Sequence, residues 1–464
     1  MSDKLYTDRS RQITGIECPR RRYLTYEMGG TGFTKIRNSI PLLTGTVVHT
    51  GLACMRRDVM EAKHKGVERV LVSQYVDIDK AVRLALKEYQ DELSRRGLDV
   101  ELGEDAEYTA KEQMALCEAL LRVYWMLDDG LQSLVDRYDI IEVEHDETYH
   151  TFSSLEDGTS IDMNAKADAL LMEHGTHDLY IASDKTIGQM DYRKENENRH
   201  DVQGLSEAFI VEKRLREWWR TLKDNGISIA NPEALNVKAL STMPDLPRIM
   251  GIQMTFLVKG RREQDNYDGK WKTRNRLLYG WAKPGIAGEE FAWTYNWSGP
   301  DVNETTGKLV GHKLGKGWRM FPTFEAVGGV KTWIDLLASG TVQPDAGNPF
   351  DGLVYTPVPC FRQDRDMQDW YEQTFALEQD WQMRVRTVEK VRNEQPQFYR
   401  QILNSLIYQN RSSCDWPSKC PCQEICFGDD SMLVNPVASG LYQIREPHHL
   451  AEAGVRKVVP IGGK

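Results

Sequence analysis

The sequence predicts an α/β protein, because helical and strand-like patterns of apolar residues occupy separate stretches of the chain. Through most of the first 135 residues, apolar side chains recur every three or four positions, as on one face of a helix. Between Asp139 and Thr186 the repeat shortens to two, and the turn-forming sequences SSLEDGTS and HGTHD interrupt it. We therefore expect three consecutive strands here, with helical segments before and after them.

Beyond these strands, the pattern predicts a helix over 202–222, a strand in IMGIQMTFLVKG and a long helical stretch over 364–411. A Gly-, Trp- and Tyr-rich region between the last two indicates an insertion of short strands and loops. The predicted organisation has five parts: an N-terminal helical part (1–135), a core hairpin with its following helix (136–222), a core strand with the β-rich insertion (223–360), C-terminal helices with a cysteine cluster (361–430) and a tail (431–464).

The composition excludes several classes of protein. With 40% hydrophobic and 28% charged residues, the 464-residue chain is expected to be globular. The sequence contains no apolar run long enough to span a membrane, and its first residues lack the apolar core of a signal peptide. We therefore expect a soluble cytoplasmic protein that does not bind membranes. A net charge of -10 argues against passive coating of nucleic acid but permits a local basic groove.

Two charged residues in the strand region could support metal-dependent hydrolysis. Asp168 lies in the second predicted strand, in AKADALL, and Lys185 ends the third, in LYIASDK. Because a tight turn joins these strands, the two side chains can come close together. Carboxylates bind Mg²⁺, and a nearby lysine can orient or deprotonate the water that attacks a phosphodiester. Taken alone, however, such a pair is equally compatible with an ordinary exposed hairpin.

Two predicted helices contribute further candidates. His49 lies in GTVVHTGL between apolar residues, where a lone histidine is more often packed in a core than bound to a metal. Gln203 lies near the beginning of the helix after the strands, where the helix dipole favours phosphate, although a glutamine there is usually just a polar surface residue. Both residues become functional candidates if they lie beside the strand pair.

The cysteines are concentrated near the end of the chain. The segment CDWPSKCPCQEIC contains Cys414, Cys420, Cys422 and Cys426. Without a secretion signal, such clustering favours a metal or iron–sulfur site over disulfides. The segment lacks the C-x-x-C spacing of structural zinc sites. Its longer regular spacing, together with the remote Cys18, favours an iron–sulfur cluster with four thiolate ligands over zinc.

In this order, the motifs resemble those of the PD-(D/E)XK nuclease superfamily: ECPRRRYL, TGTVVHTGL, AKADALL, DKT, a downstream helix with a glutamine and the C-terminal cysteines. More narrowly, the chain is similar to RecB-like exonucleases with an iron–sulfur staple, which include AddB-type subunits, CRISPR-adaptation Cas exonucleases and many phage-encoded relatives. The resemblance covers residues 10–215, 250–262 and 360–428. It implies a restriction-endonuclease-like core, with a mixed central sheet flanked by helices and with helical N- and C-terminal regions joined by the cluster.

The resemblance also implies roles for individual residues. His49 and Asp168 match metal-binding residues, Lys185 matches the catalytic lysine, and Gln203 matches the glutamine of the following helix. The implied metal is Mg²⁺ or Mn²⁺. Four cysteines match the ligands of a 4Fe-4S cluster: Cys18, Cys414, Cys420 and Cys426.

The sequence departs from the family pattern at one position. An acidic residue is expected two positions before Lys185, on the same face of the strand, but that position is Ser183. Asp184 is acidic, yet in a regular strand it points to the opposite face. A β-bulge could rotate Asp184 into the catalytic and metal-binding site.

The missing carboxylate could instead lie on another element. Glu207 is the first candidate, because it follows Gln203 by one turn on the same helix face, where relatives often carry tyrosine. Glu142 or Glu144 on the first strand come next. As a third alternative, the chain is a catalytically impaired nuclease fold that binds DNA or acts as a scaffold.

We expect a metal-dependent DNA nuclease, with exonuclease action favoured, that acts on single strands or duplex ends. A recombination or replication protein is a candidate partner, and a phage protein would act in the host cytoplasm. Basic residues alternate with aromatic ones in NYDGKWKTRNR, which suits single-stranded nucleic acid, although a solvated surface hairpin can have the same composition.

Overall fold

The computed structural model describes most of residues 4–447. The residues outside the described part are 1–3, 37–39, 69–73, 96–109, 154–159, 189, 191–201, 226–245, 416–418, 448–464 and, between 260 and 351, all but short segments.

A seven-stranded mixed sheet lies at the centre of the molecule and confirms the expected α/β class. The main strand order is β1-β4-β5-β6-β12, while β3 pairs with β4 and β13 pairs with β6. The pairs β1–β4 and β5–β6 are parallel and the others are antiparallel. The strands are β1 (Lys4–Asp8), β3 (Tyr138–Ser153), β4 (Ser160–Glu173), β5 (Leu179–Ile187), β6 (Ile249–Val258), β12 (Val354–Tyr355) and β13 (Cys360–Phe361).

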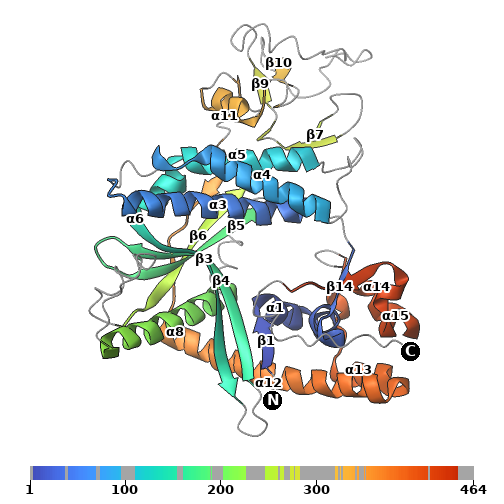
Figure 1. Ribbon diagram of the computed structural model, residues 1–464. Coiled ribbons are helices and arrows are strands. Elements are labelled where there is room, and N and C mark those ends of the chain that lie inside the picture. Colours follow the sequence, from blue (N-terminus) through green and yellow to red (C-terminus); the bar gives the residue numbers. More distant parts are fainter. Residues whose placement is uncertain are drawn as a thin grey trace, which may run out of the picture.

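Three helices, α3 (Ile40–His64), α4 (Ile78–Arg95) and α5 (Ala110–Met126), form a layer on one side of the sheet (Figure 1). Their apolar faces share one core with Tyr180 and Ala182 of β5. Removal of these faces from water provides the main attraction between the layers. A short helix, α6 (Ser133–Arg137), then leads directly into β3.

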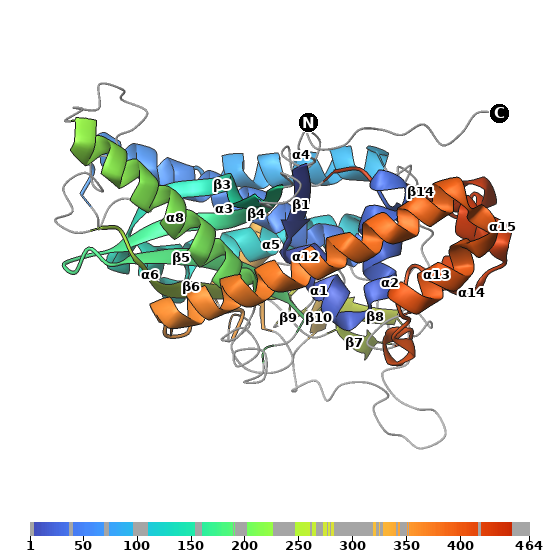
Figure 2. The same ribbon diagram turned by 90° about the horizontal axis from the view of Figure 1, so that it is seen from below.

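The other side of the sheet packs against α8 (Val202–Asn225) and the first part of α12 (Asp364–Glu394). The alternate residues of β5, Leu179 and Ile181, belong to this second core. In Figure 2, α12 runs as one long helix from α8 to the C-terminal helices. The two faces of β5 are therefore covered by different helical layers.

A third core joins the two ends of the described chain. In it, β2 (Phe33–Lys35) pairs antiparallel with β14 (Tyr442–Ile444). Arg22 forms a buried bidentate ion pair with Glu378 of α12, with N–O distances of 2.8 and 2.6 Å. The elements of this unit are α1 (Arg9–Glu17), α2 (Pro19–Arg22), β2 (Phe33–Lys35), α13 (Tyr399–Leu406), α14 (Gln423–Phe427), α15 (Asp430–Val434) and β14 (Tyr442–Ile444).

The insertion between β6 and β12 contains two small sheets in its described segments. They are formed by β7 (Arg262–Asp265) with β8 (Lys272–Asn275), and by β9 (Gly280–Ala282) with β10 (Arg319–Phe321) and β11 (Val342–Gln343). The helix α11 (Val330–Ala338) packs into the first core through Trp333, whose indole N–H donates to the Leu277 carbonyl at 2.9 Å.

The helices and strands agree with the sequence pattern except at several places. The helix α11 lies in the insertion that was expected to consist of short strands and loops, and α15 and β14 lie in the expected tail. β1 was not predicted, because it becomes a strand only by pairing with β4 at the edge of the sheet. The long helical stretch after residue 364 divides into α12 and α13 at Pro396, since proline cannot donate the next helical hydrogen bond. None of the helices in the described ranges is long and apolar enough to cross a membrane.

Candidate metal centre and its surroundings

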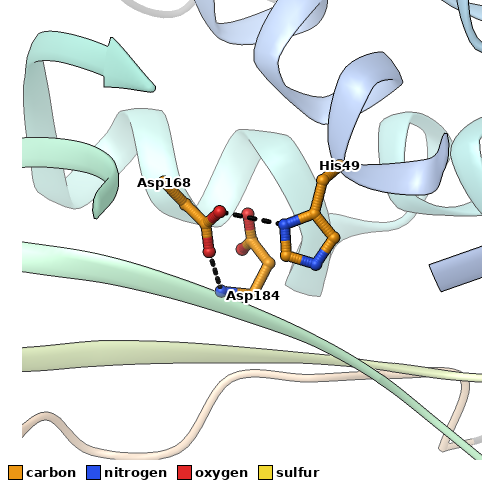
Figure 3. A group of neighbouring side chains, drawn as sticks. All are labelled: His49, Asp168 and Asp184. Carbon is orange, nitrogen blue, oxygen red and sulfur yellow. Dashed lines mark hydrogen bonds and ion pairs between the residues drawn. The ribbon is translucent and has the colours of Figure 1, made fainter. Parts of the chain in front are cut away.

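Three side chains from three elements meet beside the sheet: His49 of α3, Asp168 of β4 and Asp184 of β5 (Figure 3). One potential ligand atom of each lies within 4.8 Å of the other two. Carboxylate oxygens with one imidazole nitrogen are a donor set suited to Mg²⁺ or Mn²⁺. The structure thus brings together three of the residues that the sequence singled out.

Two contacts hold the Asp168 carboxylate. Its Oδ1 atom lies 2.9 Å from His49 Nδ1, and its Oδ2 atom accepts a 2.7 Å hydrogen bond from the backbone N–H of Asp184. The β4–β5 pairing runs to Ala169 and Ala182. The carboxylate therefore takes up a backbone donor just beyond the paired region and ties the two strands together.

The backbone is distorted opposite Asp168. Glu144, on the facing part of β3, has a φ of 51°, which is uncommon for any residue other than glycine. Such strain persists only where the surrounding structure maintains it, and it is frequent at functional sites. The distortion here coincides with the strand position that carries the candidate ligand.

The helix α3 approaches β5 closely enough to present His49. A Cβ atom on Gly45 would lie 2.8 Å from Thr186 Oγ1, so a larger residue would require the Thr186 side chain to turn away. Gly45 and His49 are four residues apart and share one face of the helix. The face of α3 that carries His49 therefore lies close to β5.

The His49–Asp168 pair is electrostatically coupled. Burial opposes ionisation of Asp168, but the adjacent His49 and the Asp184 N–H outweigh it and hold the pKa of the carboxyl below its usual value. Burial likewise lowers the pKa of His49, and Asp168 more than compensates, so that this pKa is raised. A divalent ion would displace the imidazole proton, because a coordinating histidine must be neutral.

Arg56 was not recognised from the sequence. Its guanidinium donates two hydrogen bonds to the Asp184 carboxylate, at 2.6 and 2.8 Å, and both side chains are almost fully buried. Burial alone would lower the pKa of Arg56, but Asp184 raises it, so the arginine stays charged. The available signal was position, because Arg56 follows His49 by seven residues and shares its helix face.

The structure does not contain the bulge considered for Asp184. Pairing of β5 with β6 is unbroken from Tyr180 to Ile187. Asp184 therefore faces α3 and Arg56, as strand alternation requires, while Lys185 faces the α8 side. Asp184 nevertheless approaches Asp168, because the Asp168 carboxylate reaches the end of the β4–β5 pairing.

On the α8 side, three residues form a hydrogen-bonded chain. The Lys185 ammonium donates to Gln203 Oε1, and Gln203 Nε2 donates to Glu207 Oε1 at 2.7 Å. This arrangement fixes the orientation of the amide, because only its oxygen can accept from the lysine and only its nitrogen can donate to the glutamate. The structure thus connects Lys185, Gln203 and Glu207 through two successive hydrogen bonds.

Glu207 is in an unusual environment. It is almost fully buried, and its Oε2 atom has no hydrogen-bond partner among the residues that the structure describes. Burial raises the pKa of the carboxyl to about 8, despite the opposing charge of Lys185. Asp168 is also near enough to contribute to this increase.

The other two acidic candidates have different partners. Glu142 forms an ion pair with Arg214 of α8. Glu144 pairs with Arg57 at 2.9 Å and with Lys166 at 3.1 Å. Both carboxylates are thus paired with cations, and among the described residues Glu142, Glu144 and Glu207 all lie outside the group of three around Asp168.

Cys18 lies next to the C-terminal cysteine segment, far away in sequence. The backbone N–H of Asn410 is 3.4 Å from Cys18 Sγ, and Gln409 Nε2 is 3.1 Å from Cys426 Sγ. Burial and then the neighbouring sulfurs raise the pKa of the Cys426 thiol to about 11. These N–H groups would stabilise thiolates, which are the form that binds a metal.

The sulfur atoms are nevertheless spread out. Within the described ranges, no three of them lie within 4.8 Å of one another. Tetrahedral zinc with Zn–S bonds of about 2.3 Å would require sulfurs roughly 4 Å apart. Cys422 is turned into the third core, where its Sγ lies 3.4 Å from Thr25 Oγ1.

The basic and aromatic stretch around residues 266–276 lies largely outside the described residues, so the structure does not test it as a DNA-binding surface. Neither the protein-family models nor the curated proteins include a match to this chain.

Proposed function

We propose that the protein is a divalent-metal-dependent DNA nuclease of the PD-(D/E)XK type that acts preferentially at DNA ends. The observation that carries the proposal is the convergence of His49, Asp168 and Asp184 beside the linked pair Lys185–Gln203. A mixed sheet with helices on both faces is the scaffold that the resemblance implies. DNA as the substrate, and a recombination or replication protein as the partner, rest on that resemblance.

The donor chemistry fits a magnesium or manganese ion, held by Asp168 and His49 with Asp184 beside them. When bound, the ion supplies Lewis-acid activation of water and neutralises charge on the phosphate. Lys185 positions the attacking water, and Gln203 orients its ammonium group. Arg56 holds Asp184 in a single orientation, so that the site is organised before substrate arrives.

The experiment compares Lys185→Ala with Lys166→Ala, an exposed lysine of β4 whose partner is Glu144. Purified proteins are incubated with linear and circular DNA in Mg²⁺ or Mn²⁺. Loss of Lys185 should slow degradation of linear DNA by roughly 10²- to 10⁴-fold, the usual contribution of a proton-transfer group. The Lys166 variant should keep its activity. Equal activity in both variants would contradict the mechanism.

A second candidate function is a DNA-binding or scaffold protein that retains a nuclease fold. Ser183 favours it, because β5 lacks a carboxylate on the face of Lys185. Binding of DNA without measurable binding of Mn²⁺ would support this alternative.

We also propose that a 4Fe-4S cluster joins the ends of the chain through four cysteines: Cys18, Cys414, Cys420 and Cys426. Their donor chemistry and the N–H groups near two of the sulfurs support the proposal. A four-iron cluster binds each thiolate to a different iron, so it suits sulfurs that are further apart than those of a zinc site.

A further inference from the structure

The face of β5 that carries Lys185 has no acidic residue of its own. Leu179 and Ile181 pack against α8, and alternation places Ser183 and Lys185 on that same side. Asp184 lies on the other side and is held there by a buried guanidinium. An acidic group on the Lys185 side must therefore come from another element.

The helix α8 provides such a group. Glu207 is 3% exposed and joined to Lys185 through Gln203. The Cβ atom of any larger residue at Gly204 would lie 2.0 Å from Ile252 Cδ1, so the Ile252 side chain of β6 packs directly against this turn of α8. Glu207 follows Gly204 within one turn of the helix.

One oxygen of Glu207 also lacks a partner among the described residues. Its Oε1 accepts from Gln203, whereas its buried Oε2 has no hydrogen-bond donor in the described part of the chain. Leaving a buried polar atom unpaired destabilises the folded state, so such an atom in a native protein calls for an explanation such as a functional role. Through Gln203 this carboxyl is joined to Lys185, which directly follows Asp184 of the candidate metal centre. In the metal-free structure Glu207 lies outside the group of three candidate ligands, so ligation requires its side chain to move toward them.

We propose that Glu207 supplies from α8 the acidic group that β5 lacks at Ser183. Its Oε2 atom serves as a ligand for the divalent ion of the candidate centre, and its Oε1 atom keeps Gln203 oriented toward Lys185. This inference rests on the proposed function. It assigns the carboxylate to the helix and leaves Glu142 and Glu144 in their ion pairs with basic residues.

The test removes the Glu207 carboxylate from α8 and places an aspartate carboxylate at position 183 of β5. Mn²⁺ affinity is measured by titration calorimetry for the wild type, Glu207→Gln, Ser183→Asp and the double variant, and DNA degradation is measured in parallel. Glu217→Gln, an exposed position on the same helix, is the matched control. Thermal melting in EDTA shows whether each variant is folded.

Glu207→Gln should weaken Mn²⁺ binding by roughly 10- to 100-fold, as expected for loss of a group that directly supports a metal. The double variant should recover most of that loss in both affinity and activity, while the control matches the wild type. Recovery of Mn²⁺ affinity in the double variant is the informative result. An aspartate on β5 would not substitute for Glu207 if Glu207 had only a structural role.

Three results separate the claims. Unchanged Mn²⁺ affinity in Glu207→Gln would overturn the role of Glu207 and leave the proposed function intact. Weakened binding that the double variant does not recover would overturn the replacement of Ser183. A wild-type protein that binds no Mn²⁺ would overturn the proposed function itself, and this inference with it.

Discussion

At the level of single residues, Glu207 makes stability depend on pH. Its pKa of about 8 in the folded, metal-free protein lies above the ordinary value of 4.5. The folded state therefore binds the proton more tightly than the unfolded state. This contribution is fully present below pH 4.5 and is lost as the pH rises through 8.

We therefore predict that the metal-free wild-type protein loses stability relative to Glu207→Gln as the pH rises from 5 to 9. The expected loss in the free energy of unfolding is a few kcal/mol, with an upper limit of about 1.4 kcal/mol per unit of pKa difference. Urea denaturation in EDTA at both pH values measures the difference. A constant difference between the two proteins would show that this carboxyl is not perturbed.

The sequence identified those candidate residues that match the motif order of the resemblance. Asp168, Lys185 and Gln203 could be selected by residue type and by order along the chain. Arg56 could not, because its role depends on Asp184 facing α3 in the folded strand. The unpaired oxygen of Glu207 likewise becomes apparent only when α8 is placed on the sheet.

At the level of secondary-structure elements, the Arg56–Asp184 pair fastens α3 to β5. Replacing Arg56 with methionine leaves the buried Asp184 carboxylate without its counter-ion, and breaking such a pair typically costs about 3–5 kcal/mol. We predict a loss of that size in the free energy of unfolding, measured by urea denaturation.

The neighbouring residue offers a matched control. Arg57 has a side chain that is 56% exposed and pairs with Glu144 at the surface. Arg57→Met should lower the free energy of unfolding by less than about 1 kcal/mol, because solvent screens the exposed pair. Equal losses of unfolding free energy in Arg56→Met and Arg57→Met would contradict the proposal that the Arg56–Asp184 pair fastens α3 to β5.

Element prediction succeeded where the pattern is local. Period-two and helical repeats located β3, β4, β5 and α3, since these elements bury one or two regular faces. β1 was missed, because five residues at the edge of a sheet carry no comparable repeat. Strand alternation, which is also local, correctly placed Asp184 and Lys185 on opposite faces of β5.

At the level of the whole molecule, the two ends of the chain are joined close to the cysteines. The Arg20 side chain donates to the backbone carbonyls of Ile407 and Leu403, at 2.9 and 3.1 Å. Arg22 and Glu378 add a second buried connection. Such long-range pairing cannot be inferred from spacing, although the position of Cys18 suggested it.

The cluster proposal predicts different effects for two neighbouring cysteines. Cys426→Ser should remove a ligand and reduce iron content and the brown colour of anaerobically purified protein. Cys422→Ser should retain both, because that sulfur faces Thr25 in the third core. Iron and sulfide analysis with visible absorbance distinguishes the variants. A colourless wild-type protein containing stoichiometric zinc would refute the cluster.

The proposed nuclease activity depends above all on a divalent ion at His49, Asp168 and Asp184. The most direct measurement is anomalous diffraction from crystals soaked in Mn²⁺, with an Asp168→Asn crystal as the reference. We predict a manganese peak among these three side chains in the wild type and none in the variant. The proposed metal site would be contradicted by a fully soaked wild-type crystal that lacks this peak and in which Arg56 and His49 are still paired to the two aspartates.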